Sequence, residues 1–222
     1  MKLPKLPHSM KSRARDRFEA WAITYDRSLL NRFLFLPSYQ IFLEELYAWR
    51  GESGEPFELL DVGCGTGTFD LMLAASPLKA RIVGLDYAPS MCKVARRKAE
   101  QTRVGGRLSY VAADSEHLPF ADASFDAVTC SNSFHHYPHQ QNVVMEMRRV
   151  LRPGGRLLLI DGFRDNIVGW MTFDVIIGAV EKEVFHAPWS TIHRYFEAAG
   201  FREIRRRKFN YWFPGLLTVG IA

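Results

Sequence analysis

The residues best suited to chemistry lie in a short stretch, 59–69, where alternating glycines follow an acidic side chain, Asp61. An apolar run precedes the glycines and an amphipathic run, 71–75, follows them, which predicts a buried strand, a tight turn and a helix. Glycine permits backbone angles that a Cβ forbids, so main-chain amides can approach a ligand closely at a helix N-terminus. The three glycines are Gly63, Gly65 and Gly67. We therefore expect a ligand at this turn, held most favourably through a negatively charged group.

The spacing of the glycines restricts the class of ligand that the turn can bind. A dinucleotide fingerprint, G-x-G-x-x-G, would need its third glycine where this chain has Thr68, whereas the observed pattern is G-x-G-x-G. About 20 residues beyond the turn, Asp86 ends the second predicted strand, where a carboxylate can accept hydrogen bonds from two ribose hydroxyls. Residues 87–89 include no basic side chain, so a phosphorylated ribose is not favoured. These features predict a nucleoside ligand, and a turn that binds nothing is the alternative.

Polar residues also follow the third and fourth predicted strands. Asp114 could accept a hydrogen bond from an exocyclic amine such as that of adenine, and Ala113 could contact the ring edge. The fourth strand is followed by the cluster Ser-Asn-Ser-Phe-His-His-Tyr at 131–137. Ligands of open parallel sheets lie beyond the carboxyl ends of the strands, so we expect this cluster at the same site.

Two adjacent histidines, His135 and His136, lie in this cluster. Adjacent side chains on a regular element point in different directions, so we expect at most one to line the pocket, where it could act as a general base. The pair lacks the carboxylate and third ligand of a metal site, and we therefore expect no metal. Near the N-terminus, the ring of Tyr25 beside Asp26 could cover a cationic ligand, or Tyr25 could be an ordinary core residue.

Short apolar runs alternate with amphipathic runs, which predicts βα units and a doubly wound, mostly parallel sheet. The predicted strands are 57–62, 80–85, 108–113, 124–130, 156–161, 201–210 and 213–221, and the main helices between them are 90–101, 140–151 and 190–199. Pro37 is expected to divide a helical segment, 13–49, into two helices. The basic run 205–208 alternates across a strand and suits a solvated sheet edge. The apolar stretch 168–180 fits core, a lid or a dimer face.

The composition limits the classes of protein to which the chain can belong. With 222 residues, of which 47% are apolar and 24% charged, the chain suits one globular α/β domain. A net charge of +5 permits an anionic partner or membrane surface, although a solvated basic surface is the better explanation. The three cysteines are scattered, which predicts no disulfide framework and a reducing cytoplasm. No leader peptide and no apolar stretch of about 20 residues is evident, so we expect a soluble or at most peripheral protein.

Several motifs together resemble one family. They are L-L-D-V-G-C-G-T-G at 59–67, I-V-G-L-D at 82–86, A-A-D-S-E-H-L-P-F at 112–120, S-F-D-A-V at 124–128 and V-L-R-P-G-G-R-L-L-L-I-D at 150–161. This set resembles the class I S-adenosylmethionine-dependent methyltransferases over most of 57–161. It is most similar to the small-molecule branch that includes quinone-biosynthesis C-methyltransferases and phospholipid or sterol methyltransferases, and the pair Tyr25-Asp26 is similar to that branch too.

The resemblance implies a Rossmann-like sheet of seven strands in the order 3-2-1-4-5-7-6, with the last strand antiparallel. It implies one methyltransferase domain, 1–222, with an N-terminal helical cap at 1–50, a cofactor-binding core at 57–161 and a substrate lid at 162–190. The implied cofactor is S-adenosyl-L-methionine, which leaves as S-adenosyl-L-homocysteine, and no metal is implied.

The resemblance also assigns site residues. The glycine turn would hold the methionine part of the cofactor, Asp86 the ribose, 113–115 the adenine, and Ser131 and Asn132 the region beneath the sulfonium. The full cofactor-binding set is Tyr25, Asp61, Gly63, Cys64, Gly65, Gly67, Asp86, Tyr87, Met91, Ala113, Asp114, Ser115, Ser131, Asn132 and Ser133. A carbon or phenol acceptor would need a base, for which the candidates are His136, His135 and Tyr25, whereas a neutral amine would not require one.

The expected reaction is in-line transfer of a methyl group to a small apolar or amphipathic acceptor: a quinone precursor, a lipid or a secondary metabolite. A nucleic-acid methyltransferase is the first alternative, but 131–134 lacks both prolines of the N-P-P-Y signature and the chain has no Pro-Cys dipeptide. A protein that binds the cofactor without transferring the methyl group is the second. We expect a monomer or homodimer.

Overall fold

The computed structural model describes residues 19, 29–51, 53–163, 165, 184–209 and 214–222. Its helices are α2 (Leu29–Arg50), α3 (Thr68–Ala75), α4 (Pro89–Glu100), α5 (Gln140–Val150) and α8 (Trp189–Ala198), with short 3-10 turns η2 (Gly105–Arg107) and η3 (Phe134–His136). Its strands are β1 (Phe57–Val62), β2 (Ala80–Asp86), β3 (Leu108–Ala112), β4 (Phe125–Ser131), β5 (Leu151–Gly162), β6 (Arg202–Phe209) and β7 (Gly215–Ile221). Tyr25, Asp26 and the apolar stretch 168–180 lie outside the described residues.

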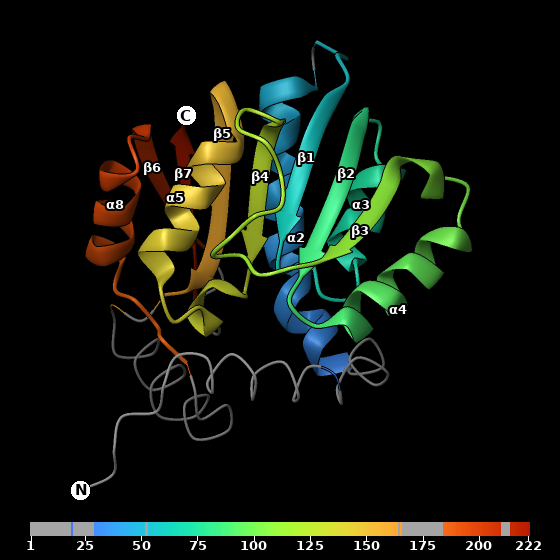
Figure 1. Ribbon diagram of the computed structural model, residues 1–222, viewed down its shortest axis with the longest axis horizontal. Helices are drawn as coiled ribbons and strands as arrows, with labels where there is room; N and C mark the ends of the chain where they lie inside the picture. Colours follow the sequence, from blue (N-terminus) through green and yellow to red (C-terminus); the bar gives the residue numbers. More distant parts are fainter. Residues whose placement is uncertain (1–18, 20–28, 52, 164, 166–183, 210–213) are drawn as a thin grey trace, which may run out of the picture.

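The strands form one twisted sheet in the order β3-β2-β1-β4-β5-β7-β6 (Figure 1). The pairs from β3 to β5 are parallel, and β7 runs antiparallel to both β5 and β6. The sequence-based prediction of the fold is therefore confirmed. Because β1, β2, β3, β4 and β5 are parallel, their carboxyl ends lie along one edge of the sheet, where the polar residues singled out in the sequence occur.

The two faces of the sheet bury different sets of side chains. Along β1, Leu60 and Val62 belong to the cluster formed with α5 and α8, whereas Phe57 and Leu59 belong to the cluster formed with α2 and α3. This alternation is the period of two that a strand imposes. Because both faces are covered by helices, the central strands read as nearly continuous apolar runs in the sequence.

Two sequence-based boundaries are wrong. Pro37 lies inside α2, which continues unbroken to Arg50. Proline removes one helical hydrogen bond, but burial of Ile41, Phe42 and Leu46 against the sheet offsets this cost. The fifth strand begins at Leu151 and not at 156, because β5 passes through a register shift around Gly154, whose φ is 79°.

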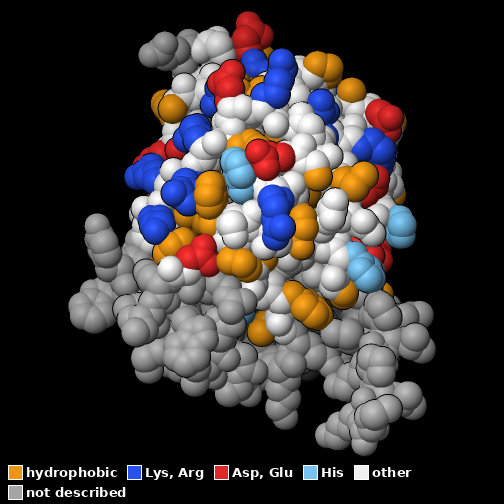
Figure 2. Space-filling view, turned by 90° about the vertical axis from the view of Figure 1, so that its left-hand side faces the viewer, with side chains coloured by type: hydrophobic (Ala, Val, Ile, Leu, Met, Phe, Trp, Pro, Cys, Tyr) orange, Lys and Arg blue, Asp and Glu red, His pale blue; other side chains and the backbone are white. Residues whose placement is uncertain are grey.

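The basic run on β6 lies on the outermost strand, as predicted. Its side chains alternate across the strand. Arg205 and Arg207 form ion pairs with Glu45 and Glu44 of α2. On the other face, the guanidinium of Arg206 lies 3.7 Å from the ring centroid of Trp189 and the ammonium of Lys208 lies 3.9 Å from that of Phe163. Figure 2, which views this side of the molecule, shows Lys and Arg interspersed with acidic and apolar side chains.

Replacement of Leu159 on β5 by alanine tests the buried core. The side chain is fully buried between helix-covered faces, so Leu159→Ala should lower the free energy of unfolding by about 2–5 kcal/mol. Met145→Ala, at a side chain that is 50% exposed on α5, is the control and should change it by less than about 0.5 kcal/mol. Urea denaturation measures both; equal losses would contradict the placement of β5 in the core.

Candidate functional site

The glycine turn between β1 and α3 is fixed by main-chain hydrogen bonds to the end of β2. The amides of Gly63 and Cys64 both donate to the carbonyl of Leu85, at 2.7 and 3.0 Å. The amide of Gly65 donates to Oδ2 of Asp86 at 2.9 Å. The turn is therefore held against the neighbouring strand and does not depend on α3 alone.

Glycine is required in this turn for two different reasons. Gly63 has a φ of 78°, and a Cβ there would clash with the Ser133 side chain. Gly65 also has a positive φ, 54°, but no atom of the described residues lies within 4 Å of its Cβ position, so none of them fills the space in front of the tip of the turn. A ligand can therefore approach the backbone at Gly65.

Asp86 connects the turn to the next helix. Besides the Gly65 amide, its carboxylate accepts the amide of Ala88 at 2.8 Å, just before α4 begins. Burial raises the pKa of Asp86 to about 6, although the two amides partly counteract it and the charge of Glu19 adds to it. The carboxylate is thus placed beside the glycine turn at the carboxyl end of β2, where the sequence predicted a ribose partner.

Asp61 does not reach the open side of the turn. Its carboxyl group is 3% exposed and accepts the hydroxyl hydrogen of Thr129 on β4 at 2.7 Å. Asp70, in the first turn of α3, is fully buried nearby, and neither of its oxygens has a hydrogen-bond partner in the described part of the chain. Burial raises the pKa of Asp61 to about 6, and burial together with the Asp61 charge raises that of Asp70 well above 3.8. The structure therefore places two carboxyl groups beneath the turn.

The end of β3 supplies a second polar loop. Oδ1 of Asp114 accepts the amide of Glu116 at 3.0 Å, and the amide of Ala113 donates to the carbonyl of Asp86 at 3.1 Å. Ser115 is buried, and His117 is exposed. On the neighbouring elements, Met91 and Cys64 are buried, and Tyr87 is half-buried. The structure thus brings the predicted adenine-side residues to the same sheet edge as Asp86.

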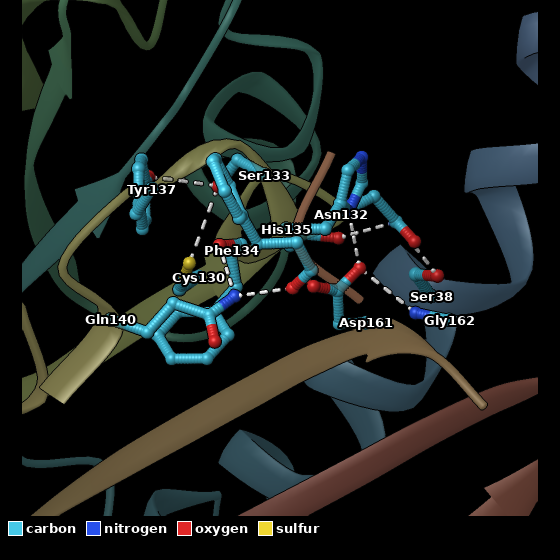
Figure 3. A network of polar contacts seen from close by, with 12 residues as sticks. Ser38, Cys130, Asn132, Ser133, Phe134, His135, Tyr137, Gln140, Asp161 and Gly162 are labelled. Carbon is cyan, nitrogen blue, oxygen red and sulfur yellow. Dashed lines mark hydrogen bonds and ion pairs between the residues drawn. The ribbon is translucent and has the colours of Figure 1, made fainter. Parts of the chain in front are cut away.

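The end of β4 continues this edge (Figure 3). Asn132 has a left-handed backbone, with a φ of 51°, and its amide nitrogen donates to Ser131 Oγ at 2.9 Å and to Ser38 Oγ of α2 at 3.1 Å. The hydroxyl of Ser133 donates to the carbonyl of Val62 at 3.3 Å. The cluster after β4 is therefore tied both to the N-terminal helix and to the start of the glycine turn.

The two adjacent histidines have different surroundings. His135 Nδ1 lies 2.6 Å from Oδ1 of Asp161, which is at the carboxyl end of β5 (Figure 3). Its ring lies 4.7 Å from that of His186 and 4.1 Å from that of His136, centroid to centroid. The side chain of His136 is half-buried.

Asp161 holds its negative charge in this environment. Burial raises its pKa, but the neighbouring His135, by charge and hydrogen bond, outweighs burial, with further help from His186 and the Gly162 amide at 2.8 Å. The net result is a pKa below the ordinary 3.8. The ligand atoms of His135, Asp161 and His186 lie within 4.8 Å of one another, so the prediction that no carboxylate or third ligand accompanies the histidines is wrong.

Some site residues escaped the sequence analysis. Asp161 carries the same signal as Asp86 and Asp114, an acid at the carboxyl end of a parallel strand, and that rule could have found it. Ser38 and His186 have no such signal, because they come from segments 94 and 51 residues away from the groups they contact. Tyr25, expected both over the cofactor and as a base, lies outside the described residues.

Comparison with known proteins shows which family and which solved structures this chain is similar to. Residues 60–159, which contain the glycine turn, Asp86 and the cluster after β4, match the family described as a methyltransferase domain. This stretch of the chain is therefore similar to a methyltransferase domain. A solved S-adenosylmethionine-dependent methyltransferase from Aquifex aeolicus shares the fold, with a TM-score of 0.65 and 17% identity over 98% of this chain and 99% of that one.

Curated relatives of the methyltransferase domain have names from quinone biosynthesis. A demethylmenaquinone methyltransferase from Thermus thermophilus is 42% identical over 106 residues, covering 48% of this chain and 47% of that protein. The ubiquinone/menaquinone biosynthesis C-methyltransferase UbiE from Bartonella tribocorum is 34% identical over 146 residues, covering 65% and 55%. The chain thus spans about half the length of the curated relatives it matches.

The buried acid of α3 gives a test of the site's electrostatics. Because the pKa of Asp70 is raised on folding, the folded protein binds an extra proton and loses stability as the pH rises above about 3.8. Asp70→Asn resembles the protonated acid at every pH. It should raise Tm at pH 8, with a gain that shrinks as the pH falls toward 4.

Glu55→Gln, at an exposed acid before β1, is the matched control and should shift Tm little at either pH. Scanning calorimetry across this pH range measures both variants. A lower Tm for Asp70→Asn at pH 8 would show that the ionised carboxylate is satisfied in the folded protein.

Proposed function

We propose that this protein transfers the methyl group of S-adenosylmethionine to a quinone precursor. The observation that carries the proposal is the glycine turn bonded to Asp86, since it combines an open backbone cradle with an acid at the end of β2. The similarity of the domain to demethylmenaquinone methyltransferases supports the acceptor class. The product of the cofactor is S-adenosylhomocysteine.

The sheet order suggests how the ligands would be arranged. The ribose would lie against Asp86 beyond β2, the adenine would extend toward Asp114 beyond β3, and the methionine part would follow the backbone near Gly65 beyond β1. Asn132 would then lie beneath the sulfonium, and the acceptor would bind beyond β4 and β5. The open Cβ position of Gly65 supports this fit, because a side chain there would occupy the space in front of the turn.

When bound, S-adenosylmethionine supplies an electrophilic methyl group on a positively charged sulfur. The chain has to orient a nucleophile in line with that methyl group and exclude water. An oxidised quinone ring is electron-poor and a weak nucleophile, so the acceptor that suits this reaction is the reduced hydroquinone. A hydroquinone also loses a proton during methylation, which requires a base. We propose that one of the two adjacent histidines, His135 or His136, serves as that base, with Tyr25 as a further candidate.

We propose that 1–50 and 162–190 form a cap and a lid over the acceptor. Two contacts of their described residues support this. Ser38 of α2 accepts a hydrogen bond from Asn132, and the amide of Phe185 donates to the carbonyl of His135 at 2.7 Å. Both segments therefore contribute to the edge of the sheet where the acceptor would bind.

No helix in the described residues is long and apolar enough to cross a membrane. We propose a cytoplasmic enzyme that needs no metal and acts as a monomer or homodimer; three buried free thiols, at Cys64, Cys92 and Cys130, are in keeping with a reducing compartment. An apolar quinone acceptor would favour peripheral contact with a membrane. No particular contact in the described residues favours a nucleic-acid acceptor.

Asp86→Ala tests the placement of the ribose. Loss of hydrogen bonds to a charged group should weaken S-adenosylhomocysteine binding by about 1–3 kcal/mol, or roughly 5- to 150-fold, in calorimetric titration. Since the pKa of Asp86 is about 6, binding by the wild-type protein should also weaken as the pH falls below that value. Asp122→Ala, on an exposed loop, is the control. An affinity for Asp86→Ala within twofold of wild type, with the fold intact by circular dichroism, would exclude this ribose site.

A further inference from the structure

His135 and Asp161 form a buried pair whose geometry fixes the state of the imidazole. An ionised carboxylate can only accept hydrogen bonds, so a separation of 2.6 Å between Oδ1 and Nδ1 requires the proton to be on Nδ1. In the neutral ring, the lone pair that can accept a proton is then on Nε2. Because the two nitrogens point to nearly opposite sides of the ring, Nε2 is directed away from Asp161.

The pair is held rigidly by its surroundings. Asp161 is fixed by the Gly162 amide, and the rings of His136 and His186 both pack against that of His135. Gln140 joins the two segments that carry these histidines, since its side-chain nitrogen donates to the carbonyls of Phe134 at 3.1 Å and Phe185 at 2.7 Å. Rigid support of this kind fixes the orientation of a group that must accept a proton in one direction.

The positions of His135 and Asp161 in the sheet suit the side on which the methyl acceptor would bind. Asp86 is at the end of β2 and the glycine turn follows β1, whereas His135 follows β4 and Asp161 ends β5. The order β2-β1-β4-β5 therefore puts the pair on the far side of the turn from the proposed ribose partner. A nucleophile approaching the methyl group in line with its bond to sulfur would come from that side.

We propose that His135 is the general base of the methyl transfer and that Asp161 is its positioning residue, so that the acceptor is one whose methylated atom or adjoining hydroxyl must lose a proton. This inference rests on the proposed function. It favours a phenol or hydroquinone over an amine, because a neutral amine needs no base to attack.

The step balances without a further reactant. Nε2 of His135 takes the proton of the acceptor, and the electron pair released forms the new bond to the methyl carbon. The bond from that carbon to sulfur breaks with its electrons left on sulfur. In ring C-methylation, the hydroxyl is reprotonated as the ring carbon loses its hydrogen, so one proton in total passes through His135 to solvent.

A metal ion held by His135, Asp161 and His186 is the competing explanation. Two ligands bonded to one ion at about 2.1 Å lie about 3 Å or more apart. The 2.6 Å separation of Nδ1 and Oδ1 is shorter and matches a direct hydrogen bond. The geometry therefore favours a proton between the two groups over a metal ion.

Methyl transfer to reduced demethylmenaquinone from radiolabelled S-adenosylmethionine provides the kinetic test on the full chain. Asp161→Asn and His135→Gln should lower kcat by about 100-fold or more, while S-adenosylhomocysteine binds within twofold of wild type. The activity of the wild type should fall at low pH when His135, which is surrounded by Asp161, His136 and His186, becomes protonated. This loss at low pH should be absent in His135→Gln. His136→Gln should lose much less activity than His135→Gln, and the exposed-site control, His117→Gln, should keep wild-type activity.

A larger loss in His136→Gln than in His135→Gln, or a stoichiometric metal ion whose removal abolishes activity, would overturn the proposal. Nitrogen-15 NMR supplies a readout that does not depend on turnover: His135 should be protonated on Nδ1 in the wild type at pH 8, and Asp161→Asn should shift it toward the other tautomer. Protonation on Nε2 in the wild type would contradict the proposal. Cofactor binding with the predicted tautomer but no methyl transfer by the wild type would instead count against the proposed function.

Discussion

The carboxylate of Asp86 is the interaction on which the site depends. It accepts the Gly65 amide of the glycine turn and the Ala88 amide before α4, so one side chain links the ends of β1 and β2. The parallel order of the central strands then brings the ends of β3, β4 and β5 to the same edge. Without this shared edge, Asp114, Asn132 and Asp161 would be polar residues scattered through the sequence, whereas together they lie along the edge where we propose that a nucleoside and an acceptor bind.

Most of the fold could be predicted from the sequence, because a parallel sheet imposes strong local patterns. Strands buried on both faces read as short apolar runs, and the glycine turn marks the first βα junction, so the order and direction of the strands could be predicted. The errors arose where tertiary packing outweighs local preference. Pro37 is tolerated within α2 because the helix buries its apolar face against the sheet, and β5 extends through Gly154 because its neighbours continue to pair with it.

The candidate site was predictable only in part. Residues at strand ends, such as Asp86 and Asp114, follow from topology, and the same rule applies to Asp161. The pairing of His135 with Asp161 depends on the turn of η3, and the contact with His186 depends on a segment distant in sequence that bonds to η3 through Phe185. Nor could the sequence show that Asp61 is buried beneath the turn with Asp70, because that follows from the packing of β4 and α3 against β1.

In the proposed arrangement, the methyl donor lies over β2 and β3 and the acceptor over β4 and β5. A crystal structure of the protein with S-adenosylhomocysteine bound tests this division most directly. The account predicts ribose hydroxyls within hydrogen-bonding distance of Asp86 and the sulfur atom between the glycine turn and Asn132. A homocysteine sulfur on the β3 side of the turn, or a ligand bound away from this edge, would contradict it.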